Sequence, residues 1–286
     1  MIDNYILENV NNFDINEVLT CGQCFNFTEI GSNEYIVIAM GSVLRIKQEG
    51  SSLVFFDTNE DEFNKKWNLY FDLERDYEII KNSIVKADPR LEDIIEKHPG
   101  IRILNQDFFE TLISFIISQN KQIPQIKQVV RNLSEMYGTP VPRSDMPGAH
   151  LFPTKEELKR ATDEGIRSCK AGFRAPYILD AVDKVSTGAV VEQDLKKMPT
   201  DEARKSLMQI KGVGEKVANC VLLFGLGRRE TFPVDVWMKR IMEHMYFHKD
   251  TPKDEIEAFA GNLFGENAGY AQQYLFMYAR EAGVVR

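Results

Sequence analysis

The stretch that decides the fold is Leu207-Met-Gln-Ile-Lys-Gly-Val-Gly-Glu-Lys216, followed after a helical run by Thr231-Phe-Pro-Val-Asp235. Gly212 and Gly214 enclose a single valine between two amphipathic segments. Glycine tolerates positive φ angles and close backbone approach, which a short connection between two helices requires. The stretch therefore predicts a helical hairpin. The free N–H groups at the start of its second helix would form a site for a phosphate oxygen.

Lys216 lies in the first turn of the second helix, where the helix dipole and partial burial both disfavour an ammonium group. A neutral amine can attack carbon and form a Schiff base. The alternative is a surface lysine that contacts phosphate as a point charge. Asp235 precedes an apolar-periodic run, so we expect it to cap a helix. Its carboxylate could also stabilise an oxocarbenium-like sugar cation, as carboxylates do in glycosidases.

Cys220 follows Lys216 by four residues and therefore lies on the same face of the helix. A buried cysteine is usually a small apolar filler. If Lys216 faces a pocket, Cys220 faces it too, and its sulfur could lie against a flat base.

The charge of the chain is distributed unevenly along its 286 residues. The net charge of −8 argues, taken alone, against nucleic acid, but residues 1–80 hold 15 of the acidic and only 5 of the basic residues. The window 204–240 holds 8 basic and 3 acidic residues. Such a basic patch is compatible with phosphate contact, although a solvated charged face would look the same.

The composition is that of a globular protein, with 43% hydrophobic and 27% charged residues and no apolar run of membrane-spanning length. Four cysteines without disulfide-scaffold density suit a reducing compartment. We expect a cytoplasmic location, or a nuclear one in a eukaryote. Cys21 and Cys24 have CxxC spacing, but no second pair completes a zinc site and no four-cysteine ladder suggests an iron–sulfur cluster.

The order of the predicted strands and helices along the chain indicates an α+β protein. An N-terminal antiparallel sheet domain, residues 1–87, would lie beside a helical region, residues 88–286. Alternating apolar residues separated by turn formers predict strands at 14–18, 24–30, 34–40, 43–48 and 53–57. Helical periodicity predicts helices at 61–71, 77–87, 90–97, 107–119, 124–137, 166–169, 175–187, 192–197, 200–210, 215–226, 236–246, 252–264 and 269–282. The proline-rich residues 138–153 predict a loop, and Thr154-Lys-Glu-Glu157 predicts a capping box that opens a further helix.

The hairpin with Lys216 and Pro233-Val-Asp235 resembles the helix–hairpin–helix, Gly/Pro-Asp (HhH-GPD) DNA glycosylase superfamily. In that superfamily the lysine marks the bifunctional branch, which removes a base and then cleaves the strand. The resemblance implies a TBP-like N-terminal sheet. It also implies phosphate contacts at Gly212 and Gly214. The backbone carbonyls of Met208, Ile210 and Val213 would hold a structural cation.

More of the chain is similar to the 8-oxoguanine DNA glycosylases. Cys21-Gly22-Gln23-Cys24-Phe25 resembles the family's Ser-Gly-Gln-x-Phe segment, whose glycine carbonyl accepts a hydrogen bond from N7–H. That proton is present on 8-oxoguanine and absent from guanine, so one acceptor separates two similar bases. Without the resemblance, the segment would be a tight turn between strands.

Three further segments resemble the same family in the same chain order. Phe115-Ile-Ile-Ser-Gln-Asn120 places Asn120 where the family's asparagine fills the space that the flipped base leaves. In Gly172-Phe173-Arg174, the phenylalanine corresponds to the family's aromatic wedge. The arginine corresponds to the residue that contacts the cytosine opposite the lesion. The last segment runs from Ala268-Gly-Tyr-Ala-Gln272 to Phe276. Its glutamine would read the Watson–Crick edge of the flipped base. Its phenylalanine would stack on one face of that base, opposite to the face at Cys220.

The chain also departs from the family pattern. Gln125 stands where the family often has an arginine that contacts cytosine, so we expect weaker discrimination of the opposite base. Trp237 replaces a histidine, and we still place it among the DNA-contacting residues. Lys211 replaces a proline, and Phe173 lacks the wedge hydroxyl.

The resemblance implies a bifunctional DNA glycosylase and AP lyase of base excision repair that flips 8-oxoguanine out of duplex DNA into a pocket between Cys220 and Phe276. Lys216 and Asp235 would be its catalytic residues. No chemical cofactor is required, and we expect a monomer that binds damaged double-stranded DNA and no membrane. Two alternatives remain open at this point: a superfamily glycosylase for another damaged base, or a noncatalytic hairpin protein that binds DNA.

Overall fold

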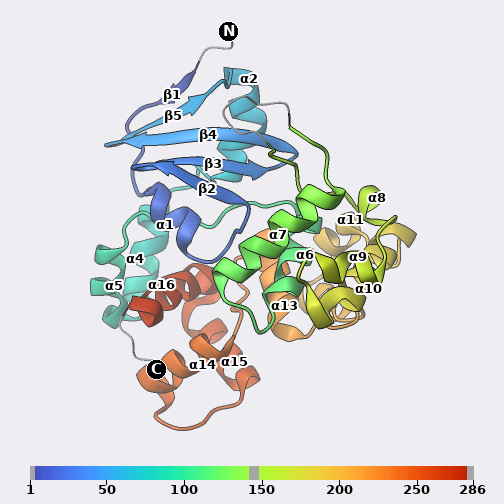
Figure 1. Cartoon of the computed structure of the whole chain (residues 1–286). Helices are drawn as coiled ribbons and strands as arrows, with labels where there is room; N and C mark the ends of the chain where they lie inside the picture. The colour runs from blue at the N-terminus through green and yellow to red at the C-terminus, as the bar shows by residue number, and fades with distance from the viewer. Residues whose placement is uncertain (1–3, 142–147, 282–286) are drawn as a thin grey trace.

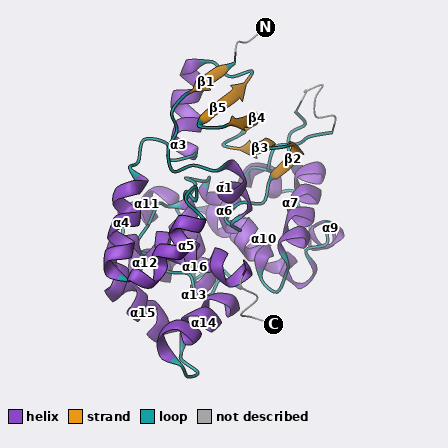
Figure 2. Cartoon of the chain, turned by 90° about the vertical axis from the view of Figure 1, so that its left-hand side faces the viewer, coloured by secondary structure: helices purple, strands orange, loops and turns teal. Residues whose placement is uncertain are grey.

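A five-stranded antiparallel sheet forms the N-terminal part of the computed structural model, which describes residues 4–141 and 148–281 (Figure 1). Its strands are Tyr5–Leu7 (β1), Phe27–Gly31 (β2), Glu34–Ala39 (β3), Ser42–Glu49 (β4) and Ser52–Phe56 (β5). The order across the sheet is β1-β5-β4-β3-β2. Strands β2 to β5 correspond to four predicted strands and pair in consecutive order, and β1 pairs with β5 at the edge farthest from the helical body (Figure 2).

The predicted strand at 14–18 is wrong, because these residues begin helix α1 (Ile15–Thr20). The Asp14 carboxylate accepts hydrogen bonds from the N–H groups of Asn16 and Glu17 and so caps this helix. Ile15, Val18 and Leu19 are buried, and their spacing fits one face of a helix as well as it fits part of a strand. The first strand is instead Tyr5–Leu7, which the sequence did not predict.

One face of the sheet is covered by the helical segment that follows it. Alternate residues point to this face, among them Val37, Leu44, Ile46 and Phe55. They pack against the aromatic side chains of the π-helical turn η1 (Phe63–Trp67) and of α3 (Asn68–Tyr70), which follow the short polar helix α2 (Glu60–Glu62). The sheet and this segment therefore share one apolar core.

The helical body accounts for the rest of the described chain (Figure 1). Its helices are α4 (Tyr77–Ala87), α5 (Glu92–Lys97), α6 (Phe108–Ser118), α7 (Ile123–Tyr137), α8 (Lys155–Leu158), α9 (Asp163–Ser168), α10 (Ala175–Thr187), α11 (Glu192–Lys197), α12 (Thr200–Leu207), α13 (Glu215–Cys220), α14 (Val236–Met242), α15 (Lys253–Phe264) and α16 (Ala268–Glu281). Helices α13 and α14 continue as the π-helical turns Val221–Gly225 and Glu243–Phe247. Within the described ranges, no helix combines the length and the apolar character that a membrane crossing needs.

Most of these helices match their predictions closely. The capping box of α8 is confirmed: Glu157 N–H donates to Thr154 Oγ1, and Thr154 N–H donates to the Glu157 carboxylate. Residues 142–147 of the predicted loop, and Ala282 of the last predicted helix, lie outside the described residues.

Two segments join the sheet to the helical body. The Cys21–Phe25 turn belongs to both: Cys24 packs in the core of the sheet, whereas Cys21 and Phe25 pack in the core of the body. Helix α4 also packs into the core of the body through Tyr77 and Ile84. The division of the chain at residue 87 stays a prediction.

We expect Leu44→Ala to lower the free energy of unfolding by about 2–5 kcal/mol, because it removes the packing contacts of the three carbon atoms beyond Cβ at a site that is 1% exposed. The matched change Leu69→Ala, at a site that is 53% exposed, should stay within about 0.5 kcal/mol. Urea unfolding would measure the change in the free energy of unfolding for both variants, provided that their m-values equal that of the wild type. Equal losses for the two variants would show that the sheet does not have the core described here.

Candidate active site

A cavity of about 390 Å³ lies among the Cys21–Phe25 turn and helices α6, α7, α13 and α16. Its size is within the range of ligand pockets. It brings together seven residues that the sequence predicted from four separate segments: Gly22, Lys216, Cys220, Asp235, Trp237, Gln272 and Phe276. We call this space the base cavity.

Lys216 enters the base cavity from the first turn of α13. Its Nζ donates to Ser118 Oγ at 3.3 Å and lies 5.1 Å from the centre of the Phe115 ring. Ser118 Oγ donates its own proton to the Phe115 carbonyl at 2.8 Å, so towards Lys216 it acts as an acceptor. This contact fixes the amine at the end of α6.

Asp235 caps helix α14, as predicted. Its Oδ1 accepts a hydrogen bond from Met238 N–H at 2.7 Å. In the part of the chain that the structure describes, its Oδ2 has no hydrogen bond, and the residue lines the same cavity as Lys216. The cap therefore holds a carboxylate rigidly beside the amine.

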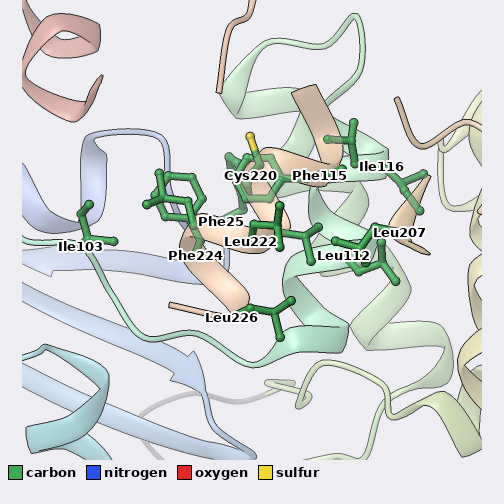
Figure 3. Packing of buried hydrophobic residues seen from close by; sticks show 14 of the residues in the cluster. Phe25, Ile103, Leu112, Phe115, Ile116, Leu207, Cys220, Leu222, Phe224 and Leu226 are labelled. Atoms are coloured by element: carbon green, nitrogen blue, oxygen red, sulfur yellow. The ribbon is translucent and has the colours of Figure 1, made fainter. Parts of the chain in front are cut away.

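Cys220 forms one wall of the base cavity, where it lies beside Phe115 (Figure 3). Burial raises the pKa of its thiol to about 11, although the neighbouring Lys216 opposes this shift. The thiol is therefore neutral near pH 7. It presents a polarisable surface rather than a charge to anything in the cavity.

Phe276 and Gly22 line another part of the base cavity, where they contact each other. Gly22 has a φ of +83°, and a Cβ atom there would lie 3.0 Å from Phe276 Cε1. The turn is held by the fully buried Gln23, whose amide donates to the carbonyls of Val18 and Arg102 at 2.8 and 2.7 Å. Glycine is thus required at residue 22 both by its backbone angle and by the ring beside it.

Gln272 carries an acceptor that lacks a partner. The residue is 7% exposed, and its Oε1 has no hydrogen bond within the described residues. Leaving such a group unpaired costs about 1–3 kcal/mol. A ligand with an N–H donor would remove that cost. A cavity lined by a thiol, an aromatic ring and an unpaired acceptor suits a planar, hydrogen-bonding ring.

A second cavity of about 390 Å³ lies beside the first and contains two more predicted residues, Asn120 and Gly214. Asn120 is exposed and has a φ of +52° just after the end of α6. Trp237, which is 43% exposed, lines both cavities. We call this space the outer cavity.

Phe173 and Arg174 differ in their exposure. Phe173 is 49% exposed on the turn that begins at Gly172, whose φ is +63°. Arg174 is 4% exposed, and its guanidinium donates to the carbonyls of Gln119 and Ala171. The structure therefore places Arg174 as a support for the loop before Asn120, and its contact with an opposite base stays a prediction.

The hairpin contains one glycine that its conformation requires. Gly212 has a φ of +77°, and a Cβ atom there would lie 2.3 Å from Tyr177 Cδ2. Gly214, the N-cap of α13, is extended, and the space where its Cβ would lie is open. The start of α13 is therefore accessible from the outer cavity.

The predicted cation ligands lie in the same hairpin. The Ile210 carbonyl accepts a hydrogen bond from Val213 N–H at 3.0 Å, whereas no backbone group of the described chain bonds to the carbonyls of Met208 and Val213. Carbonyl oxygens suit a hard cation. Among the residues that the structure describes, no group of three His, Cys, Asp or Glu side chains could hold a metal ion, and all four cysteines are buried free thiols.

The sequence did not predict five polar residues that line the base cavity: Ser118, Lys121, Gln122, Gln273 and Arg280. Ser118 and Lys121 flank the segment that contains Asn120, so their position was a usable signal. Gln273 and Arg280 lie on α16 near Gln272 and Phe276. Nothing in their local sequence distinguishes them from structural residues.

Two family descriptions match the chain. "8-oxoguanine DNA glycosylase, N-terminal domain" matches residues 5–112, and "HhH-GPD superfamily base excision DNA repair protein" matches residues 113–265. A probable N-glycosylase/DNA lyase of Methanothermobacter thermautotrophicus is 32% identical over 256 residues, which is 81% of this chain and 79% of that protein.

Solved structures with DNA are similar over nearly the whole chain. The 8-oxoguanine glycosylase/lyase of Clostridium acetobutylicum, in complex with double-stranded DNA containing cytosine opposite 8-oxoG, is 39% identical with a TM-score of 0.94. The match covers 99% of this chain and 97% of that one. The structure of MBOgg1 with a low-affinity DNA ligand is 45% identical with a TM-score of 0.95, over 98% and 96% of the two chains.

We expect Gly212→Ala to destabilise the fold by more than about 2 kcal/mol, because the left-handed backbone costs 1–2 kcal/mol and the methyl group overlaps the Tyr177 ring. The control is Gly227→Ala, where φ is +71° but the space is open. The free energy of unfolding of Gly227→Ala should fall only by the cost of the left-handed backbone, about 1–2 kcal/mol. Thermal unfolding would compare them, and equal losses would refute the tight contact between the hairpin and α10.

Proposed function

The chain belongs to the 8-oxoguanine DNA glycosylase family of the HhH-GPD superfamily, and we propose that it excises 8-oxoguanine from duplex DNA and cleaves the strand with the residues described above. The observation that carries this proposal is the base cavity. It joins an amine, a carboxylate and an unpaired acceptor between Cys220 and Phe276. The chain binds DNA as the substrate of this reaction.

Recognition of the lesion rests on one acceptor that guanine cannot use, with a second that holds the Watson–Crick edge of the base. The flipped base would lie between Cys220 and Phe276, with the Gly22 carbonyl accepting a hydrogen bond from N7–H of 8-oxoguanine. Guanine has no proton at N7, so it would leave this acceptor unpaired. Gln272 Oε1 would accept from a donor on the Watson–Crick edge, which removes the cost of its own burial.

The chemistry begins when the lone pair of Lys216 Nζ forms a bond to C1′ and the bond from C1′ to the base breaks. The base leaves with the electron pair and takes up a proton. The Asp235 carboxylate stabilises the positive charge that develops on the sugar. Ring opening then gives a Schiff base between Lys216 and C1′, and elimination of the 3′ phosphate from this adduct cleaves the strand.

Exposed residues around the two cavities would deform the duplex. Phe173 would enter the stack as a wedge, and Asn120 would fill the space that the base leaves. Unstacking costs a few kcal/mol, which contacts at Gly212, Gly214 and Trp237 help to offset. Gln125 closes a capping box through its bond with Gln122 N–H, so a weak preference for cytosine opposite the lesion is the expected consequence.

Three further properties belong to the same proposal. A cation held by the carbonyls of Met208, Ile210 and Val213 would neutralise charge beside a bound phosphate. The protein would act as a monomer. It would work in the cytoplasm, associated with the nucleoid, in a bacterium, or in the nucleus of a eukaryote, because DNA is the substrate.

Borohydride trapping tests the role of Lys216. A duplex with a single 8-oxoguanine should form a stable covalent adduct with the protein, because borohydride reduces a Schiff base to an amine. Lys216→Gln should abolish the adduct while the duplex still binds. Lys211→Gln is the matched control, since Lys211 belongs to the same hairpin but lines neither cavity, and it should trap normally.

Either of two results would contradict the mechanism. An adduct with Lys216→Gln would assign the nucleophile to another amine. Bound but untrapped wild-type protein would refute the lyase step. A panel of duplexes with other oxidised or alkylated bases, assayed beside 8-oxoguanine, separates this function from that of a glycosylase with another substrate.

Gly22→Ala tests the recognition of the base. The added methyl group would displace the Phe276 ring and shift the turn, so we expect a loss of at least about tenfold in kcat/KM, which corresponds to 1.4 kcal/mol. Gly41→Ala is the control, because Gly41 also has a positive φ, +64°, but lies in open space away from the base cavity. Equal activity of the two variants at matched stability would argue against this role of Gly22.

A further inference from the structure

The two cavities meet at the reacting groups. Both are lined by Ser118, Lys121, Lys216, Asp235 and Trp237. The base cavity extends from these residues towards Gly22 and Phe276, and the outer cavity extends away from them towards Asn120 and Lys253. Lys216 and Asp235 therefore stand at a boundary between two spaces of equal size.

A nucleotide has its parts in the same linear order. Its base is attached to C1′, and its phosphates are attached to the other side of the sugar. If the base fills the base cavity and C1′ lies at Lys216, the sugar occupies the boundary. A phosphate next to the lesion must then lie in or beside the outer cavity.

The outer cavity carries the charge that such a phosphate needs. Its lining includes Lys121, Lys216 and Lys253 against a single carboxylate, Asp235, which already caps a helix. Within the described residues, Lys121 and Lys253 form no ion pair. Two other lysines, which line neither cavity, differ in this respect, because Lys239 pairs with Asp250 at 2.7 Å and Lys249 pairs with Glu255 at 4.0 Å.

The surroundings of Lys121 support the same conclusion. Burial and the nearby Arg174 guanidinium lower the pKa of Lys121, so this part of the cavity is electropositive without a compensating acid. Lys253 comes from the start of α15, more than a hundred residues away in the chain. Its side chain is exposed at the other side of the cavity.

We propose that the outer cavity is the binding site for a DNA phosphate next to the lesion, with Lys253 and Lys121 as its cationic ligands. This inference rests on the proposed function, because it takes the base cavity as the place of the flipped base. It assigns Lys253, which lies outside the hairpin and outside every motif described above, to the DNA interface. The proposed contact ties α15 to the sugar–phosphate backbone while Lys216 and Asp235 act on the sugar.

The test is the salt dependence of binding to a duplex that carries a tetrahydrofuran abasic analogue, which the enzyme cannot process. Each phosphate contact contributes a slope of about −0.9 to the plot of log K against log salt. We expect Lys253→Gln to weaken binding severalfold at low salt and to reduce the slope by about 0.9. Lys121→Gln should act in the same direction.

Lys249→Gln is the matched control, because Lys249 is an exposed lysine four residues before Lys253 that lines neither cavity. It should keep the wild-type slope. If Lys253→Gln gives the same slope and affinity as this control, the phosphate site is refuted. Thermal unfolding of each variant would show whether a loss of binding reflects a loss of folded protein.

A parallel assay separates this inference from the proposed function. Wild-type protein in excess should excise 8-oxoguanine in a single turnover. Normal excision together with an unchanged Lys253→Gln slope refutes the phosphate site and leaves the function intact. Absent excision together with a reduced slope refutes the function and leaves a phosphate-binding surface beside the outer cavity.

Discussion

The buried polar contacts of Gln23 and Arg102 are the constraint on which the site depends. Gly22 belongs to the turn after α1, yet it must reach a cavity whose other walls come from the helical body. Gln23 fixes it there by donating to the Arg102 carbonyl and accepting from Leu104 N–H at 2.8 Å. Without these bonds, the acceptor for N7–H would have no fixed position relative to Lys216.

Arg102 makes further hydrogen bonds to other segments of the N-terminal part of the chain. Its guanidinium is 4% exposed and donates to the carbonyls of Asn11, Asn12 and Asp72 at 2.7–2.9 Å, with its face 4.3 Å from the Tyr77 ring. Burial lowers the pKa of this group, so the cost of burying the charge is met by acceptors from several segments. A similar closed network of Arg204, Asn219 and Glu257 holds α13, which carries Lys216, against α12 and α15. The turn that carries Gly22 and the helix that carries Lys216 are thus fixed by buried and partly buried polar contacts before any DNA binds.

The sequence predicted those features that depend on local pattern or on a motif of the family. The hairpin, the cap at Asp235 and helix α10 follow from residues close together in the chain, and Cys220 follows from its helical spacing to Lys216. The helix at Ile15–Thr20 was missed because its short apolar pattern also fits a strand, and only the Asp14 cap decides between them. Lys253 could not be predicted, because it reaches the outer cavity from α15, about forty residues of chain after Lys216. The burial of Arg174 likewise depends on the Gln119 carbonyl of another helix end.

The acidic net charge of the chain does not conflict with DNA binding, because electrostatic interactions in salt are local. At physiological ionic strength the Debye length is about 8 Å, so charges on the sheet beyond that distance contribute little at the cavities. The acidic excess is in residues 1–80, and the edge strand β1 lies far from the hairpin in both views of the chain (Figures 1 and 2). At the cavities, the balance is set by Lys121, Lys216 and Lys253 against Asp235. A phosphate therefore meets a positive field at the site where the base can be extruded, while the acidic sheet gives no comparable attraction elsewhere.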